Sequence, residues 1–131
     1  MESWLDRTGP VDYLTLPEVA RVVIEAIEHR RGTTWNVFEY VLMPSHLHLF
    51  FELVQPGLKT CLEQFKRWTA HQSCKVAGLD VNRFWQDEWF DHWSRSDPED
   101  DRIVWYMRQN PVKAKLVEQY EDWPFGSWSR R

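Results

Sequence analysis

The sequence has few of the residues that mark several large classes of protein. It contains two cysteines, Cys61 and Cys74, in 131 residues. Two cysteines are too few for a disulfide scaffold, so we expect reduced thiols. No apolar run approaches the roughly 20 residues of a membrane-spanning helix, and residues 1–9 lack the apolar core of a signal peptide. We therefore expect no membrane partner and a cytoplasmic location.

An excess of basic residues is also lacking. Lysine and arginine number 16 against 20 acidic residues, which gives a formal net charge of −4. Because binding to DNA phosphates needs basic surface, any contact with nucleic acid must depend on local patches. Tryptophan, by contrast, is abundant, with nine residues. We expect most of these rings to pack in the core and one or two at most to stack on bases.

The first half of the chain has the pattern of a helix followed by two strands. Residues 15–18 predict a capping box that opens a helix, and residues 30–32 would close it. Residues 33–43 are β-branched and aromatic on both faces, which is typical of an inner strand. Residues 46–53 alternate strictly, so one face carries leucines and Phe51 while the other carries histidines.

The second half of the chain also has the patterns of helices and a strand. Residues 58–76 predict an amphipathic helix with Leu62, Phe65, Trp68 and Thr69 inward. The later elements that we expect are a short strand within 84–93, a capping box at 96–99 opening a helix to Gln109, a break at 110–111 with a short helix after it, and an extended strap at 123–128. The chain is thus predicted to be one α+β domain, residues 1–131, with two helices covering the leucine face of the sheet and the histidine face open or only partly covered.

Two histidines suggest a metal site. His46 and His48 are two residues apart on a predicted strand, so both imidazoles project from the same face. This spacing allows one metal ion to be bound by both rings. The alternative is a pair of half-buried histidines satisfied by hydrogen bonds. Leu47 between them would anchor the strand and leave the pair accessible.

The predicted helix after residue 96 places Tyr106 and Asn110 four residues apart, on one face. Asn110 could supply an amide oxygen as a third ligand, with Tyr106 one turn away. Alternatively, Asn110 caps the next helix, which begins with a proline, and Tyr106 is a core aromatic. Both roles of Asn110 could hold together.

At this point the sequence resembles the REP-associated tyrosine transposases, which belong to the single-tyrosine branch of the His-hydrophobe-His endonucleases. The resemblance runs from about Trp4 to Trp128 and is strongest where the His-Leu-His strand is joined to Tyr-x-x-x-Asn-Pro-Val-Lys-Ala. The matching segments are residues 41–49 (VLMPSHLHL), 84–86 (FWQ), 90–92 (FDH), 106–114 (YMRQNPVKA) and 122–124 (DWP).

The resemblance implies a ferredoxin-like antiparallel sheet, with helices on one face and the tyrosine helix at the other. It implies Mg²⁺ or Mn²⁺ held by His46, His48 and Asn110. It implies Tyr106 as the nucleophile on a phosphate of single-stranded or hairpin DNA, giving a 5′-phosphotyrosyl link in the bacterial cytosol. A phenol is a weak nucleophile near neutral pH, and a metal that polarises the phosphoryl group would assist it.

The chain departs from the family pattern in two respects. It begins near the loop after the usual first strand, so that strand is expected to be missing, and a homodimer could fill the open edge. Lys115 stands where glycine is common. An alternative function is therefore a domesticated or truncated relative that binds DNA hairpins without transposition.

Five basic residues are candidates for phosphate contacts. They lie on the second predicted helix and around the tyrosine: Lys66, Arg67, Lys75, Arg108 and Lys113. The alternative for each is a solvated helix face.

Overall fold

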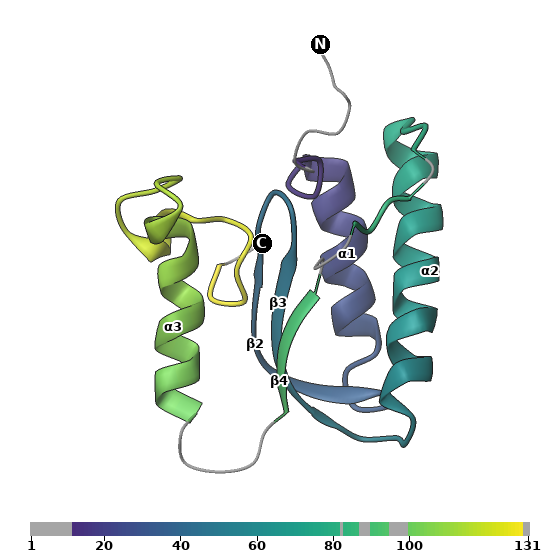
Figure 1. Ribbon diagram of the computed structural model, residues 1–131, viewed down its shortest axis with the longest axis horizontal. Helices are drawn as coiled ribbons and strands as arrows, with labels where there is room; N and C mark the ends of the chain where they lie inside the picture. The colour runs from purple at the N-terminus through teal and green to yellow at the C-terminus, as the bar shows by residue number, and fades with distance from the viewer. Residues whose placement is uncertain (1–11, 82, 87–89, 95–99, 130–131) are drawn as a thin grey trace.

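The computed structural model describes residues 12–81, 83–86, 90–94 and 100–129. The elements form three layers, in which α1 and α2 lie on one face of a small sheet and α3 lies on the other (Figure 1). Their bounds are α1 (Pro17–His29), β2 (Trp35–Leu42), β3 (Leu47–Leu53), α2 (Leu58–Ala77), β4 (Phe90–Ser94), α3 (Asp100–Lys113) and the 3₁₀ helix η1 (Tyr120–Asp122). The α+β class and the placement of the helices on the two faces are as predicted.

The sheet has the strand order β2-β3-β4. Strands β2 and β3 are an antiparallel pair with a bulge between Val37 and Glu39. Strand β4 lies directly beside β3 and is parallel to it. The prediction of a wholly antiparallel sheet is wrong for this pair, because α2 carries the chain back over the sheet and β4 re-enters in the direction of β3. Among the described residues, no strand separates the two.

The larger core lies between the sheet and the two covering helices. Leu47, Leu49 and Phe51 of β3 point into it and are fully buried. This confirms the predicted alternation, since the side chains of a strand point to opposite faces in turn. From the helices, Ile27 of α1 and Phe65 of α2 fill the same core. Burial of such large apolar side chains supplies most of the free energy that holds the sheet in place.

A smaller core lies on the opposite face, beneath α3. It consists of Val41 and Met43 from the hairpin, Phe50 of β3, Met107 of α3 and Trp123. Met107 is fully buried. The tyrosine-bearing helix is therefore packed on the sheet through an apolar contact of its own.

The segment after η1 runs along the outer edge of β2, as the yellow trace in Figure 1 shows. Leu42 N donates to Phe125 O over 2.9 Å, and Ser127 N donates to Tyr40 O over 3.0 Å. The indole Nε1 of Trp123 donates to Leu42 O over 3.0 Å. The segment predicted as an extended strap at residues 123–128 follows this edge of the sheet, but it consists mostly of turns around an isolated bridge between Gly126 and Val41. It satisfies backbone groups at this edge.

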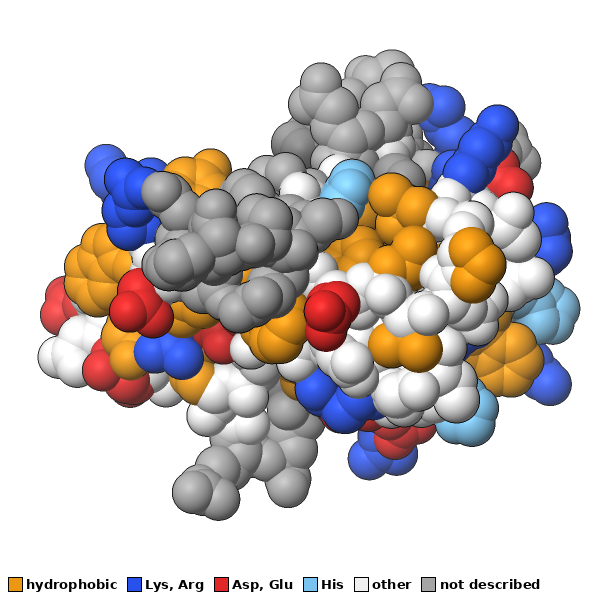
Figure 2. All heavy atoms as spheres, turned by 90° about the horizontal axis from the view of Figure 1, so that it is seen from below, with side chains coloured by type: hydrophobic (Ala, Val, Ile, Leu, Met, Phe, Trp, Pro, Cys, Tyr) orange, Lys and Arg blue, Asp and Glu red, His pale blue; other side chains and the backbone are white. Residues whose placement is uncertain are grey.

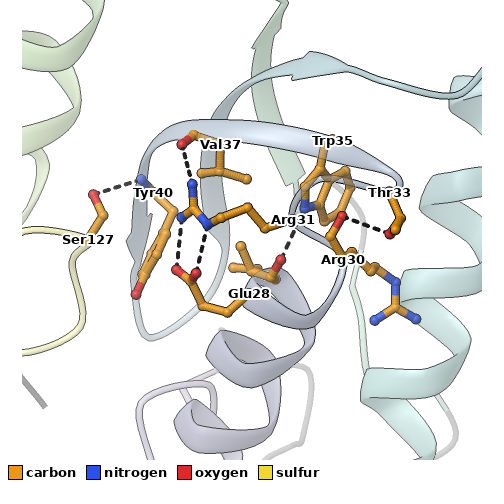
Figure 3. Close-up of polar contacts among 9 residues, drawn as sticks. Glu28, Arg30, Arg31, Thr33, Trp35, Val37, Tyr40 and Ser127 are labelled. Atoms are coloured by element: carbon orange, nitrogen blue, oxygen red, sulfur yellow. Dashed lines mark hydrogen bonds and ion pairs between the residues drawn. The ribbon is translucent and has the colours of Figure 1, made fainter.

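Arg31 fixes the turn between α1 and β2 (Figure 3). Its guanidinium binds both carboxylate oxygens of Glu28, over 2.8 and 3.0 Å, and donates to Val37 O over 2.8 Å. These hydrogen bonds to Glu28 raise the pKa of Arg31. The carbonyl at the bulge thereby gains a charged donor in place of a regular ladder partner.

Several local predictions are wrong. Leu16 caps α1 with no side-chain hydrogen bond, so the capping box at residues 15–18 does not form. Trp68 faces outward and is 50% exposed. Helix α3 does not break at Asn110 but continues through Pro111 to Lys113. The capping box predicted at residues 96–99 lies outside the described residues.

None of the helices in the described ranges is long and apolar enough to cross a membrane.

Candidate active site

The imidazole side chains of His46 and His48 converge. His46 immediately precedes β3 and His48 is its second residue. The Nε2 atoms of the two rings are 2.8 Å apart and share a hydrogen bond, as the alternative of hydrogen-bonded histidines predicts. Adjacent ligands of an octahedral ion at about 2.1 Å lie about 3 Å from each other, so this pair of nitrogens fits one divalent cation. The convergence of both imidazoles, predicted from their spacing, is confirmed.

Ser45 orients the first ring. Its Oγ lies 3.0 Å from His46 Nδ1. A hydrogen bond at one imidazole nitrogen fixes the ring and directs the other nitrogen toward a ligand. Sequence reasoning missed this role, although a hydroxyl directly before His46 was visible in the sequence.

The histidine face is partly covered, which is one of the two alternatives predicted for it. His48 is only 3% exposed, and His46 is half-buried. The cause is the second core, because Phe50 on the same face of β3 packs against Met107 of α3. A site at these histidines is therefore partly enclosed between the sheet and the tyrosine helix, which lowers the local dielectric.

Tyr106 and Asn110 share one side of α3. The amide Nδ2 of Asn110 donates to Tyr106 O over 3.2 Å and to Met107 O over 3.3 Å. Pro111 has no N–H, so it cannot donate to the Met107 carbonyl four residues earlier. Asn110 supplies the missing donor, which explains how the helix passes through Pro111 and why Asn110 does not end it.

This arrangement also orients the Asn110 amide. Because its NH₂ group binds the helix backbone, its oxygen Oδ1 is the atom turned away from these carbonyls. An amide oxygen is a ligand that hard divalent cations accept. The donor set of two imidazoles and one amide oxygen thus fits Mg²⁺ or Mn²⁺ chemically. Within the described residues, no group of three or more His, Cys, Asp or Glu side chains could hold a metal ion.

The contacts of Arg108 show how α3 is rotated about its own axis. Arg108 Nε binds Glu39 of β2, and its Nη1 binds the hydroxyl of Tyr120 in η1, so this flank faces β2 and η1. At 100° per residue, Tyr106 lies 200° from Arg108 around the helix. Asn110 follows Arg108 by two residues, so it too lies 200° from Arg108 around the helix, on the side of Tyr106. The flank that bears both residues is therefore turned toward the side of the sheet where β3 and β4 lie.

Tyr106 is accessible, with 42% of its surface exposed. Lys113 Nζ stands 4.8 Å from the centroid of its ring. An ammonium over a phenol ring is held by the negative face of the ring, and it is also placed where a phosphate beside the hydroxyl would meet it. The alternative of a core aromatic does not apply to Tyr106, since half-buried Ile103 and Val104 and buried Met107 make the inner face instead.

Arg108 has a role other than the phosphate contact predicted for it. Its Nε lies 2.6 Å from Glu39 Oε2, and its guanidinium packs over the rings of Tyr120 and Trp128 at 5.2 and 5.7 Å. The hydrogen bond to Glu39 raises the pKa of Arg108. Because this guanidinium is committed to a buried carboxylate, we leave it out of any DNA surface. The sequence held a clue, since Glu39 is the one charged residue in the strand Trp35–Leu42.

The basic residues of α2 do not share one surface. Lys66 lines a hollow between α2 and β4. Lys75 is nine residues further on, which is a rotation of 180° around the helix, and is exposed on the opposite side. Arg67 is exposed between these two directions. Sequence reasoning grouped the three because they share a helix, and left Lys59, which is close in direction to Lys66, out of the candidates for phosphate contacts.

No model of a protein family matches this chain. The REP-associated tyrosine transposase of Escherichia coli (strain K12) is 26% identical over 105 residues, which cover 79% of this chain and 61% of that protein. A Haemophilus influenzae protein with a provisional form of the same name is 28% identical over 103 residues, covering 68% of this chain and 56% of that protein. The chain therefore spans less than two thirds of the length of these curated relatives.

The fold has a counterpart among solved structures. The structure of a REP-associated tyrosine transposase bound to a REP hairpin aligns with a TM-score of 0.61 and 22% sequence identity, over 90% of this chain and 68% of the other. At this identity the likeness concerns the fold. In sequence and in fold, this chain resembles the REP-associated tyrosine transposases.

Proposed function

We propose that this protein nicks and rejoins single-stranded DNA, with Tyr106 as nucleophile and a divalent metal at His46 and His48. The observation that carries the proposal is the 2.8 Å approach of the two Nε2 atoms on the sheet face that α3 covers. The flank of that helix with Tyr106 and Asn110 is turned toward the same side. A protein that only binds DNA needs neither the paired imidazoles nor an accessible tyrosine.

The cation would be held by His46, His48 and the amide oxygen of Asn110. When bound, it would polarise the phosphoryl oxygens and neutralise the charge that develops on them. Since the three ligands carry no negative charge, we expect weak affinity without DNA, whose phosphate would complete the set. Mg²⁺ and Mn²⁺ are the natural candidates for such a donor set.

The chain's own groups account for the reaction at phosphorus. The exposed Tyr106 hydroxyl gives its proton to solvent, and its oxygen forms a bond to the scissile phosphorus. The bond from phosphorus to the 3′ oxygen breaks, and that oxygen leaves as a free 3′-hydroxyl after taking a proton. The 5′ phosphate is then a tyrosyl diester, and attack by another 3′-hydroxyl reverses the step, so strands are rejoined without an external energy source.

The residues around Tyr106 position the DNA in this proposal. Lys113 is placed to bind the phosphate next to the tyrosine ring. Asn110 is held by its bonds to the helix backbone, which fixes its amide relative to Tyr106 on the same helix. The burial of His48 excludes water from the same region, which strengthens each electrostatic contact there.

The substrate we propose is single-stranded DNA, with a hairpin beside the cleaved strand, in the bacterial cytosol. The hairpin bound in the related structure supports this choice. A shared site, in which the tyrosine helix serves a partner chain, is not part of the proposal. Met107 and Arg108 pack α3 on the sheet of its own chain.

A covalent adduct tests the proposal. The protein is incubated with hairpin DNA that carries a labelled single-stranded flank, in Mn²⁺ or in EDTA, and run on a denaturing gel. A labelled protein band that depends on Mn²⁺ is the expected result. Tight binding of the hairpin with no adduct under any metal would instead identify a hairpin-binding relative that does not cleave.

A further inference from the structure

A hollow of about 440 Å³ lies between the first turns of α2 and strand β4. It is separate from the histidine site and on the other face of the sheet. Its lining combines apolar, aromatic and basic side chains: Leu58, Lys59, Leu62, Glu63, Lys66, Phe90 and His92. We call it the α2–β4 groove. Figure 2 views the molecule from the end at which α2 begins, and hydrophobic side chains lie there beside a histidine and basic side chains.

The wall of the groove formed by β4 is an aromatic platform. The rings of Phe90 and His92 are stacked, with centroids 5.0 Å apart and an angle of 21° between their planes. His92 also packs on Phe51, at 5.7 Å, and Phe51 is fully buried in the larger core. The platform is therefore fixed from behind by the core, while both of its rings remain partly exposed. A preset flat aromatic surface favours stacking of another planar ring, because little side-chain entropy is lost.

The opposite wall carries positive charge. Lys59 and Lys66 are seven residues apart, which is close to two helical turns, so both lie on the side of α2 that faces the groove. Glu63 lies in the lining as well and is exposed. The lining therefore carries two positive charges and one negative charge. An acidic ligand with a planar aromatic part matches both walls, and a nucleotide has both features.

The groove is one strand away from the histidines. In the β3–β4 pair, Leu47 stands opposite Phe90 and Leu49 stands opposite His92. His48 lies between these two leucines on β3, and its side chain points to the other face. Since β4 is the last strand of the described sheet, a DNA strand that leaves the histidine site around this edge meets the groove on the other face.

From these observations we infer that the α2–β4 groove binds the unpaired nucleotides that flank the cleaved phosphate. One base stacks on Phe90 and His92, and its neighbouring phosphates bind Lys59 and Lys66. This inference rests on the proposed function, to which it adds a second contact on the single strand. Base–aromatic stacking is tolerant of sequence, so the groove holds the strand in place without reading it.

The charges are tested with a fluorescein-labelled dT₁₂ strand and anisotropy at several salt concentrations. In Lys59→Gln/Lys66→Gln, the slope of log K against log salt should fall by about 1.4, at about 0.7 per phosphate contact in a single strand. Lys75→Gln is the matched control, because Lys75 is an exposed lysine on the opposite side of the same helix. Equal slopes for the double variant and the control would overturn the assignment.

The stacking is tested with a strand in which 2-aminopurine replaces one base, since stacking quenches its fluorescence. Phe90→Leu keeps an apolar side chain and removes the aromatic face. We expect this variant to lose the quenching and on the order of tenfold in affinity for the strand. Unchanged quenching would show that the base does not rest on Phe90. A blunt hairpin without flanks should bind the parent and all these variants alike, and an equal loss there would refute specificity for single strands.

The groove and the cleavage reaction can fail separately. If the parent forms the Tyr106 adduct and the groove variants bind dT₁₂ as the parent does, the groove assignment is wrong and the cleavage proposal stands. If the parent forms no adduct but the groove variants lose strand binding, the cleavage proposal is wrong and the groove assignment stands.

Discussion

Arg108 of the tyrosine helix binds Glu39 of β2, with Nε 2.6 Å from Oε2. Glu39 is 4% exposed, so its carboxylate is paired with the guanidinium inside the fold and not at the surface. The same guanidinium reaches Tyr120 and Trp128 of the C-terminal segment. This ion pair thus connects the sheet, the tyrosine helix and the strap. It also fixes the rotation of α3 about its own axis, and with it the direction in which Tyr106 projects.

The first prediction concerns this ion pair. Arg108→Met should lower the free energy of unfolding by about 3 kcal/mol, because it leaves a buried carboxylate without its partner. Glu39→Met/Arg108→Met should recover much of this loss, since no buried charge remains. Urea denaturation of the two single variants and the double variant measures the coupling, with Arg67→Met as an exposed control. Additive effects would mean that the two side chains do not act as a pair.

The second prediction concerns the end of α3. Lys115 has a φ of 61°, in the left-handed region, and it is the one non-glycine residue with a positive φ among those described. Its N–H donates to Val112 O over 2.9 Å, and Leu116 N donates to Pro111 O over 3.0 Å, as in a helix C-cap. Glycine adopts this conformation without strain, so Lys115→Gly should raise the free energy of unfolding by about 1 kcal/mol. Lys115→Ala retains the strain and should bring no such gain. Equal stabilisation by both substitutions would point to the lost charge instead.

The third prediction concerns the metal. His46→Ala and His48→Ala should each abolish Mn²⁺ binding in the presence of uncleavable DNA, as measured by titration calorimetry. Cleavage should fall by about 100-fold or more, since a ligand has been removed outright. His71 is exposed on α2, so His71→Ala serves as the histidine control. Full cleavage in EDTA would exclude the metal role.

The fourth prediction concerns alkaline pH. Burial raises the pKa of Tyr13 to about 12, and its hydroxyl donates to Phe84 O. The unfolded chain ionises near pH 10, so the protonated phenol favours folding below that pH and the benefit is lost as pH rises toward 12. Tyr13→Phe keeps the stacking on Phe84, whose centroid is 4.9 Å away. It should show a shallower decline of stability between pH 10 and 12. The same slope in both proteins would argue against this group.

The sequence predicted much of the fold because its patterns are local. The alternation in β3 and the apolar periodicity of α1 and α2 each arise within one element. The parallel β3–β4 pair could not be predicted in this way. It depends on where α2 returns the chain, which is a tertiary matter.

The site was predicted unevenly for the same reason. The meeting of His46 and His48 follows from strand geometry, and it was foreseen. The continuation of α3 through Pro111 was not, because it depends on a hydrogen bond from Asn110 to Met107 O that replaces the one proline cannot make. The engagement of Arg108 with Glu39 was also missed, since a residue 69 positions away supplies the partner.

The identity of the nucleophile is the central claim, and mass spectrometry of the covalent adduct tests it most directly. Trypsin cleaves after Arg102 and Arg108, and the peptide 103–108 (IVWYMR) contains one hydroxyl group, that of Tyr106. After nuclease trimming of the DNA, the nucleotide phosphate should appear on this peptide. Tyr106→Phe should form no adduct while binding hairpin DNA as the parent does, and Tyr120→Phe should still form it. A nucleotide found on any other peptide, or an adduct formed by Tyr106→Phe, would contradict the account.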